Sequence, residues 1–472
     1  MLEIYTAQIP IITSTQCDKH TSLQIHLSLF ASTIVNNLGY FKHLFNMWRL
    51  LSWLLTMTVI LFAIPLFFLL IGIELYADRK KKTGYYRTND AITSLSAGVL
   101  SRIVAIGHQL IPFTIYVLVF DAVSLFELPQ AWWVWVIAFV AYDFFYYWNH
   151  RLGHEMSILW AAHVVHHSSE DYNLTTALRQ TSGAVFSWVF YLPLALVGFT
   201  PQMIITVGAL NLVYQFWVHT QHITTLGWME KVFVTPSNHR VHHAQNRIYI
   251  DKNYGGVFIL WDRLFSTYMP EKKEEPVVFG IRGALKSFNP LWANLQIYSQ
   301  LAKDSYYTRS WTDKFRVWFG RTGWRPADVS ERFPKGKLPL SNFRKYHPHI
   351  HKSVTRYTLF QHVIMLGAAL YFLLKLDTLS GMQQMAIVLT VVVMSIQNGF
   401  ILSQSKLALA LEGPRLLMFP LLWIASGIGI AAWCFALSSV VGLVMLLFAV
   451  RYSNYRRPIE EVRLSTEPEN LA

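Results

Sequence analysis

The sequence is poor in charge and in cysteine. Only 14% of its 472 residues are charged, whereas soluble proteins average about 25%, so the chain has too few charges to cover a water-facing surface. Its two cysteines, Cys17 and Cys434, exclude a disulfide framework and a cysteine-rich zinc site. Hydrophobic residues make up 53% of the chain, and its mean hydropathy is +0.32. The composition therefore indicates a membrane protein rather than a secreted scaffold, a disordered tail or an ordinary cytosolic enzyme.

Long apolar runs predict an all-α fold, a polytopic membrane helical bundle of about eight to nine spans. A bilayer core needs about 20 apolar residues per helix. The runs of suitable length are 50–73, 103–120, 131–148, 357–374, 383–402 and 416–434, followed by a shorter ninth segment at 438–450. Residues 180–229 contain no Asp, Glu, Lys or Arg, and Pro201 is expected to divide them into two helices.

The placement of basic residues predicts the orientation of the chain. Loop 74–102 carries six basic residues, and the stretch 269–357 carries 17 Lys and Arg against 7 Asp and Glu. Because basic loops mark the cytoplasmic side, we expect a multi-pass protein with both segments in the cytoplasm, in a bacterial inner membrane or the endoplasmic reticulum. Tryptophans within the basic stretch favour a membrane surface over nucleic acid as its partner. The simpler interpretation of the basic stretch is a water-facing surface whose charges follow the same cytoplasmic rule.

Histidine is the unusual residue, because ten of the 18 histidines lie in recurring patterns. There is one H-x3-H pair and there are two H-x2-HH clusters. A further pair lies between these two clusters, at the end of the fifth predicted span. The ten are His150, His154, His163, His166, His167, His219, His222, His239, His242 and His243. Residues three and four apart share one face of a helix, and imidazole suits Zn, Cu, Fe and Ni. Counting the spans places all ten at the cytoplasmic interface, and ten ligands are enough for two metals.

Five stretches of sequence resemble a known superfamily. They are YRTNDAITSLSAGVLSR (86–102), YYWNHRLGHE (146–155), WAAHVVHHSSEDYNLTTALRQ (160–180), YQFWVHTQHI (214–223) and TPSNHRVHHAQNRIYIDKNYGGVFILWDRLFSTY (235–268). These stretches are similar to the fatty acid hydroxylase/sterol desaturase superfamily of membrane-bound di-iron oxygenases. Within it, they resemble the alkylglycerol monooxygenase branch, which cleaves ether lipids.

The resemblance implies iron ligands at the eight histidines of the three clusters and at His219, with His222 as a tenth candidate. The branch often has a histidine where this chain has Asn238, so His222 is a candidate to replace it. The resemblance also implies a lipid substrate, O₂ and an electron donor, for which reduced tetrahydrobiopterin is the cofactor of the animal enzymes.

Two carboxylates are further candidates near the histidines. Glu155 follows the first cluster, and the resemblance implies that it orients a ligand imidazole. Asp143 lies inside a predicted span, where a carboxylate costs about 2.5–3.5 kcal/mol and is a functional candidate by default. Its plain alternative is a structural ion pair with Arg102 or Arg151.

The predicted domain organisation has five parts. An N-terminal tail (1–49), with residues 1–46 expected to be poorly ordered, precedes a membrane catalytic domain (50–268). A basic cytoplasmic connector (269–356), C-terminal transmembrane helices (357–451) and a tail (452–472) follow.

Three classes of function fit a histidine-rich membrane site. The favoured prediction is a lipid C–H oxygenase that cleaves an alkylglycerol ether, with sterol, carotenoid or fatty acyl hydroxylation or desaturation as alternatives. A membrane zinc hydrolase needs a carboxylate general base, and only Glu155 is available among the clusters. A metal transporter needs ligands in the middle of its spans, whereas these lie at the ends.

Overall fold

The computed structural model describes residues 63–108, 110–183, 186–336, 339–452 and 462–463. The predicted N-terminal tail and the first part of the predicted span 50–73 lie outside these residues, and residues 63–81 are helical. Within the described ranges the chain is predominantly helical, as predicted, and its strands form one antiparallel pair of two residues each, β1 (Arg344–Lys345) and β2 (Val462–Arg463).

The predicted span 103–120 is wrong in its boundaries. Helix α2 runs from Thr88 to His108, and α3 (Leu110–Val123) continues from it with a bend of 50°. The start of α2 is polar, and hydropathy therefore assigns it to a loop. However, Asp90, Ser94 and Ser101 are buried against other parts of the protein, so the helix extends about four turns further than its apolar run.

The break predicted within residues 180–229 is present, but the first of its two helices is short. The segments are η1 (Ser187–Tyr191), α7 (Leu192–Val197) and α8 (Pro201–Trp217), with Pro201 in the first turn of α8. The apolar helix Ser187–Val197 is shorter than the about 20 residues that a bilayer requires. It packs against α3 and α4 (Trp132–Glu155).

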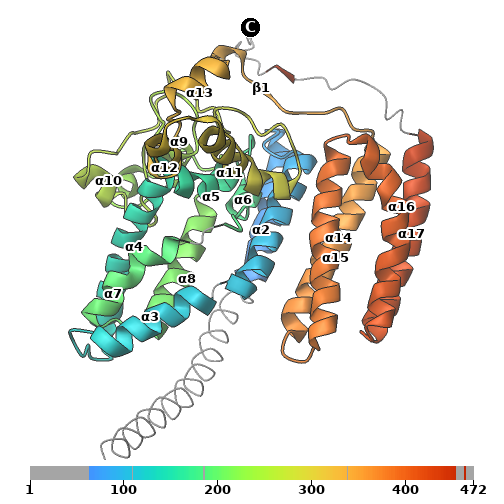
Figure 1. Cartoon of the computed structure of the whole chain (residues 1–472), viewed down its shortest axis with the longest axis horizontal. Coiled ribbons are helices and arrows are strands. Elements are labelled where there is room, and N and C mark those ends of the chain that lie inside the picture. The colour runs from blue at the N-terminus through green and yellow to red at the C-terminus, as the bar shows by residue number, and fades with distance from the viewer. Residues whose placement is uncertain (1–62, 109, 184–185, 337–338, 453–461, 464–472) are drawn as a thin grey trace, which may run out of the picture. The chain divides into compact units, whose positions relative to one another are not determined.

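The remaining elements before the C-terminal bundle are short, apart from α11, and two of them carry histidine clusters. They are α5 (Ser157–His167), α6 (Leu174–Ala177), η2 (Gly227–Lys231), α9 (Pro236–His242), α10 (Leu260–Leu264), α11 (Pro290–Tyr307), α12 (Trp311–Phe319), α13 (Ala327–Arg332) and η3 (Leu340–Asn342). Helices α11 and α12 both pack on α5 (Figure 1).

Four long helices form the C-terminal bundle: α14 (Lys352–Lys375), α15 (Gly381–Leu402), α16 (Lys406–Ala425) and α17 (Ile430–Tyr452). The predicted span 416–434 is wrong, because the chain turns between α16 and α17. Gly427 and Gly429 have φ values of 69° and 74° there, a left-handed conformation that glycine adopts at little cost. The ninth segment, short in the sequence, is consequently a full helix.

The described residues contain four helices long and apolar enough to cross a membrane, or five if the bent α2–α3 pair is one span. The four are those of the C-terminal bundle, which lie side by side in Figure 1. They indicate a membrane protein, although by length and composition the described residues do not reach the eight to nine spans predicted.

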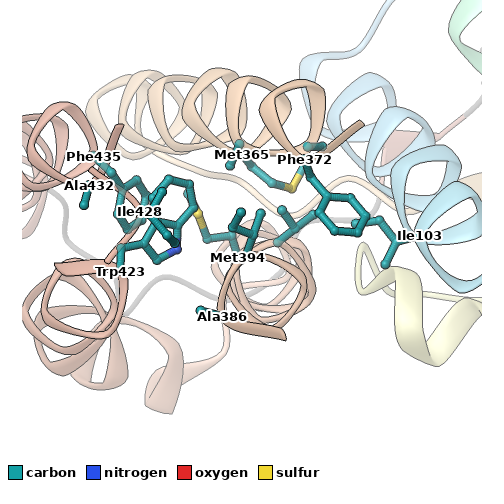
Figure 2. Close-up of a cluster of buried hydrophobic side chains, with 13 residues drawn as sticks. Ile103, Met365, Phe372, Ala386, Met394, Trp423, Ile428, Ala432 and Phe435 are labelled. Carbon is teal, nitrogen blue, oxygen red and sulfur yellow. The ribbon is translucent and has the colours of Figure 1, made fainter. Parts of the chain in front are cut away.

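The core of the C-terminal bundle is apolar and reaches α2. Met394 of α15 lies between Met365 and Phe372 of α14 on one side and Trp423 of α16 on the other, and Ile103 of α2 closes one end of the cluster (Figure 2). Met365 is fully buried, and Met394 is 1% exposed. This packing fixes α2, whose polar first half contacts the histidine-bearing part of the chain, against the bundle.

Candidate metal centre

Four segments carry the predicted ligands to one place. His150 and His154 lie in the last turns of α4, and the second cluster lies in the second half of α5. His219 follows the end of α8, and the third cluster lies on and directly after α9. Helix α9 is only seven residues long and begins at Pro236, where the Thr235 side chain accepts a hydrogen bond from the Asn238 backbone N–H. This cap starts the helix where its histidines face those of α5.

Nine of the ten predicted histidines converge in two groups, and within each group the candidate ligand atoms all lie within 4.8 Å of one another. The first group is His150, His154, His163, His167 and His242. The second group is His166, His219, His239 and His243. The groups adjoin, since the His167 and His243 rings stack with centroids 4.3 Å apart. His150 and His243, 93 positions apart in the sequence, therefore belong to one site.

The Nε2 atoms of His166 and His219 face each other with no proton between them. His166 Nδ1 and His219 Nδ1 lie 3.1 and 2.7 Å from backbone carbonyl oxygens, to which only an N–H can donate. Their Nε2 atoms are consequently bare acceptors, yet they lie 3.2 Å apart. His150 Nδ1 likewise donates to a carbonyl, while its Nε2 lies 3.0 Å from His163 Nε2. Facing lone pairs repel unless a cation lies between them.

The spacing of these atoms fits a metal ion in each group. Metal–nitrogen bonds of about 2 Å place neighbouring ligand atoms about 3 Å apart and opposite ones about 4 Å apart. Within the two groups, four further buried ring nitrogens have no hydrogen-bond partner among the described residues: His154 Nε2, His239 Nδ1, His242 Nε2 and His243 Nε2. Burial lowers the pKa of His166 to about 4, so its imidazole is neutral at pH 7 and able to bind a metal.

Backbone carbonyls orient the ligand imidazoles. The Tyr254 carbonyl accepts from His150 Nδ1 at 2.7 Å, and the Lys252 carbonyl accepts from His242 Nδ1 at 3.1 Å. The residue between them, Asn253, is buried and has a φ of 57°. Its Nδ2 donates to the carbonyls of Asn238 and Met269, and its Oδ1 accepts from the Met269 N–H. Asn253 thus fixes the loop that orients two histidines of the five-histidine group.

Asp143 holds the following part of the same loop. Its carboxylate accepts from the backbone N–H groups of Val257 and Phe258 and from the side chains of Asn211 and Trp261. The alternative of an ion pair with Arg102 or Arg151 is therefore wrong, although the role of Asp143 is structural. The close approach also explains Gly256, because a Cβ at that position would lie 2.7 Å from Asp143 Oδ1.

Asp262 anchors the loop from the other side. It accepts from the backbone N–H groups of Tyr254 and Gly255 and from the Thr267 hydroxyl. Burial raises the pKa of Asp262 to about 6. Sequence reasoning identified neither this residue nor Asn253, although both lie in the string 235–268. Their signal is an Asn in the irregular segment that follows the third histidine cluster and an Asp directly after an apolar run.

Glu155 and His222 lie beside the site. Glu155 Oε1 accepts from Arg151 Nε at 3.0 Å and lies 3.5 Å from the Tyr254 hydroxyl, and the structure shows no bond from Glu155 to an imidazole of the described residues. His222 is outside both groups, and its ring lies edge-on to Tyr85. It does not take the place of a ligand at Asn238, whose side chain donates to the Phe233 carbonyl.

Comparison with known proteins identifies the family. A model of the fatty acid hydroxylase family matches residues 135–267. The chain is 40% identical to alkylglycerol monooxygenase of Homo sapiens over 377 residues, which are 76% of this chain and 81% of the human protein. The chain belongs to the alkylglycerol monooxygenase family. It is also 36% identical to the protein of that name from Xenopus tropicalis, over 71% of this chain and 73% of the relative. The chain is 36% identical to the Danio rerio protein of that name, over 76% of this chain and 81% of the relative. No solved structure matches the chain.

Family membership confirms the predicted resemblance and the class of enzyme. This alkylglycerol monooxygenase family member is an oxygen-dependent lipid monooxygenase, an oxidoreductase of the fatty acid hydroxylase superfamily. The matched residues 135–267 include all nine converging histidines and the loop that orients two of them.

Proposed function

We propose that the chain cleaves the ether bond of alkylglycerols with two iron ions, one held by each histidine group. The five-histidine group would be His150, His154, His163, His167 and His242, and the four-histidine group would be His166, His219, His239 and His243. The single observation that supports this most strongly is the convergence of nine imidazoles in a member of this family, with the bare Nε2 atoms of His166 and His219 facing each other. His222 is not included, because it lies outside both groups.

Iron in such a site supplies the oxidising power that breaks an unactivated C–H bond with O₂. The chain itself supplies neutral, fixed ligands. The carbonyls of Tyr254, Lys252 and Arg179 hold the protons of three imidazoles on the nitrogen that faces away from the metal. Because eight of the nine histidines are buried, the site also limits contact with bulk water.

The proposed reaction balances with one O₂ and two electrons. One oxygen atom is inserted into the C–H bond beside the ether oxygen, and the second leaves as water with two electrons and two protons from a reductant. The resulting hemiacetal collapses to a fatty aldehyde and a glycerol derivative, and the inserted oxygen stays in the aldehyde. We propose reduced tetrahydrobiopterin as the electron donor, on the family resemblance alone.

The proposal places the site at the cytoplasmic face of a multi-pass membrane protein. The segments that contact the site from outside, α11 and α12, lie in the basic stretch of the chain, and excess basic residues mark cytoplasmic segments. Glu155 and Asp143 act through the loop at 252–262 in this proposal, since Asp143 binds its backbone and Glu155 lies beside the Tyr254 hydroxyl.

The test is product analysis with labelled oxygen. The protein, purified in lipid nanodiscs after iron supplementation, is given a reduced pterin, ¹⁸O₂ and an alkylglycerol, and the aldehyde is trapped by reduction to the alcohol. We expect two iron ions per chain and ¹⁸O in the fatty alcohol. The matched ester, a sterol and a fatty acid serve as parallel substrates. Bound zinc with ester hydrolysis would overturn the proposal, and labelled product from the sterol or the fatty acid alone would overturn the ether-lipid substrate.

A further inference from the structure

Helix α12 presents three large aromatic side chains to the outside. Trp311, Phe315 and Phe319 are 76%, 67% and 61% exposed. Their spacing of four residues aligns them along one side of the helix, and we call them the aromatic face. On the other side Val317 is fully buried, where it packs with Ala161 of α5 and with α11. The aromatic face is therefore a stable feature of a helix that is firmly packed on its opposite side.

The neighbouring helix also exposes apolar side chains. Near its start α11 exposes Leu291, Trp292 and Leu295, and at its end, which three residues separate from α12, it exposes Tyr306. Helices α11 and α12 pack against each other. Exposed apolar groups that are rimmed by polar residues mark an interaction site rather than ordinary solvent-facing surface.

The α11–α12 pair is fixed at the ends of longer helices. Just before α11, the Phe288 N–H donates to Ser403 Oγ at the end of α15, a candidate membrane span. Just after α12, the Gly320 carbonyl accepts from the Ser157 N–H, and the Thr322 N–H donates to the Glu155 carbonyl at the end of α4. The pair is consequently tied at its start to the end of a candidate membrane span and at its end to the last turn of α4.

Basic residues lie on the same two helices or next to them. Lys303 and Arg309 are exposed on or beside these helices, and the stretch 269–357 carries an excess of ten positive charges. Aromatic side chains are enriched at membrane interfaces, and basic residues are attracted to anionic lipid. Together they favour an anionic bilayer surface over a second copy of this basic chain, which would bring like charges together.

We propose that α12 lies in the plane of the membrane and inserts its aromatic face among the head groups of an anionic bilayer. The inference rests on the membrane assignment and not on the reaction. Because the buried side of α12 packs on α5, which carries His163, His166 and His167, this contact would hold the histidine site at the depth where lipid head groups lie.

The test measures the depth of single residues of α12 in the full-length protein. Cys17 and Cys434 are replaced by Ala, and a nitroxide label is attached at Phe315→Cys or, as the matched control, at Arg316→Cys. Position 316 is exposed on the same helix but points about 100° away from position 315. In nanodiscs rich in phosphatidylglycerol we expect the label at 315 to collide more with O₂ and less with a water-soluble nickel complex than the label at 316.

Three outcomes would overturn the proposal. Equal nickel collision at both positions would mean that the aromatic face is in water. Dipolar broadening between labels at position 315 of two chains, without lipid contact, would mean that a second copy covers the face. Equal depth of the label at position 315 in nanodiscs of phosphatidylcholine and of phosphatidylglycerol would mean that the basic residues have no role. None of these measurements requires turnover, so failure here is distinguishable from failure of the proposed reaction.

Discussion

The histidine-bearing part and the C-terminal bundle are held together by different contacts. Around the histidines, buried charged groups such as Asp143, Arg179 and Asp262 bind the backbone of short helices and loops. In the bundle, long helices pack through apolar side chains such as Met365 and Met394. The difference shows that the metal centre depends on the exact course of irregular backbone, whereas the bundle depends on the volume of its core.

One polar cluster in the bundle departs from this division. Arg415 of α16 forms an ion pair with Glu412 at 2.6 Å and donates to Gln361 of α14 at 2.8 Å, and Tyr357 donates to Glu412. Glu412 is fully buried and Arg415 nearly so. A buried ion pair of this kind is weak evidence for stability. It does specify how α14 and α16 align, which apolar packing alone leaves less defined.

Replacing a ligand should give the largest effect and separate the two regions. We expect His242→Ala, and equally His166→Ala, to abolish turnover and to lower bound iron, because each removes an imidazole from one of the two groups. Neither should unfold the protein, since the apolar bundle is untouched. The measurements are iron per chain and the thermal midpoint in detergent.

His349→Ala is the matched control, because His349 is an exposed histidine in the loop before α14. It should leave iron and turnover unchanged. Equal losses in all three variants would mean that the histidine clusters support the fold rather than a metal.

A core change in the bundle should have the opposite signature. Met394→Ala leaves a cavity between α14 and α16 and should lower the free energy of unfolding by about 2–5 kcal/mol. Iron per folded chain should stay the same, because Met394 packs in a cluster separate from the histidines. Met385→Ala on the same helix is the control, since Met385 is 68% exposed and its loss should cost less than about 0.5 kcal/mol. Loss of iron in the folded Met394 variant would contradict the division into two regions.

Asn253→Ala should affect the site more than the fold. It removes hydrogen bonds to Asn238 and Met269 and places alanine at a φ of 57°. Loss of an outer partner of metal ligands typically lowers metal affinity or activity about 10–100-fold, and we expect iron affinity to fall in that range with an altered Mössbauer spectrum. Asn253→Asp keeps the acceptor oxygen but turns a second oxygen toward the carbonyls of Asn238 and Met269, so it should lower iron affinity at least as much as alanine. Asn342→Ala, at an exposed asparagine, should change nothing, and an unaltered spectrum in the alanine variant would contradict the positioning role.

The same contrast explains what the sequence could predict. Histidine spacing identified nine converging side chains, because a helix fixes which residues share a face. Hydropathy placed α15 within a few residues but misplaced α2 and α16, because it does not register polar side chains that are buried, such as Asp90, or a turn made by two glycines. The carbonyls of Lys252 and Tyr254 could not be predicted at all, since a backbone acceptor leaves no signature in residue type.

Glu155→Gln should give the smallest effect on the site. It tests whether a carboxylate that does not touch a histidine still influences the site. The carboxylate pairs with Arg151 on the same helix, and both side chains are partly exposed, so the change should cost less than about 1 kcal/mol of stability. Its other neighbour is the hydroxyl of Tyr254, whose carbonyl orients His150. We therefore expect a fall in alkylglycerol turnover within the about 10–100-fold range of outer partners, and nearer its lower end, with iron retained. Asp328→Asn is the comparison, because Asp328 forms an exposed ion pair with Arg332 four residues along α13 and makes no hydrogen bond to the histidine loop among the described residues. Turnover at the wild-type rate in the Glu155 variant would remove this carboxylate from the site and leave backbone carbonyls as the groups that orient the histidines.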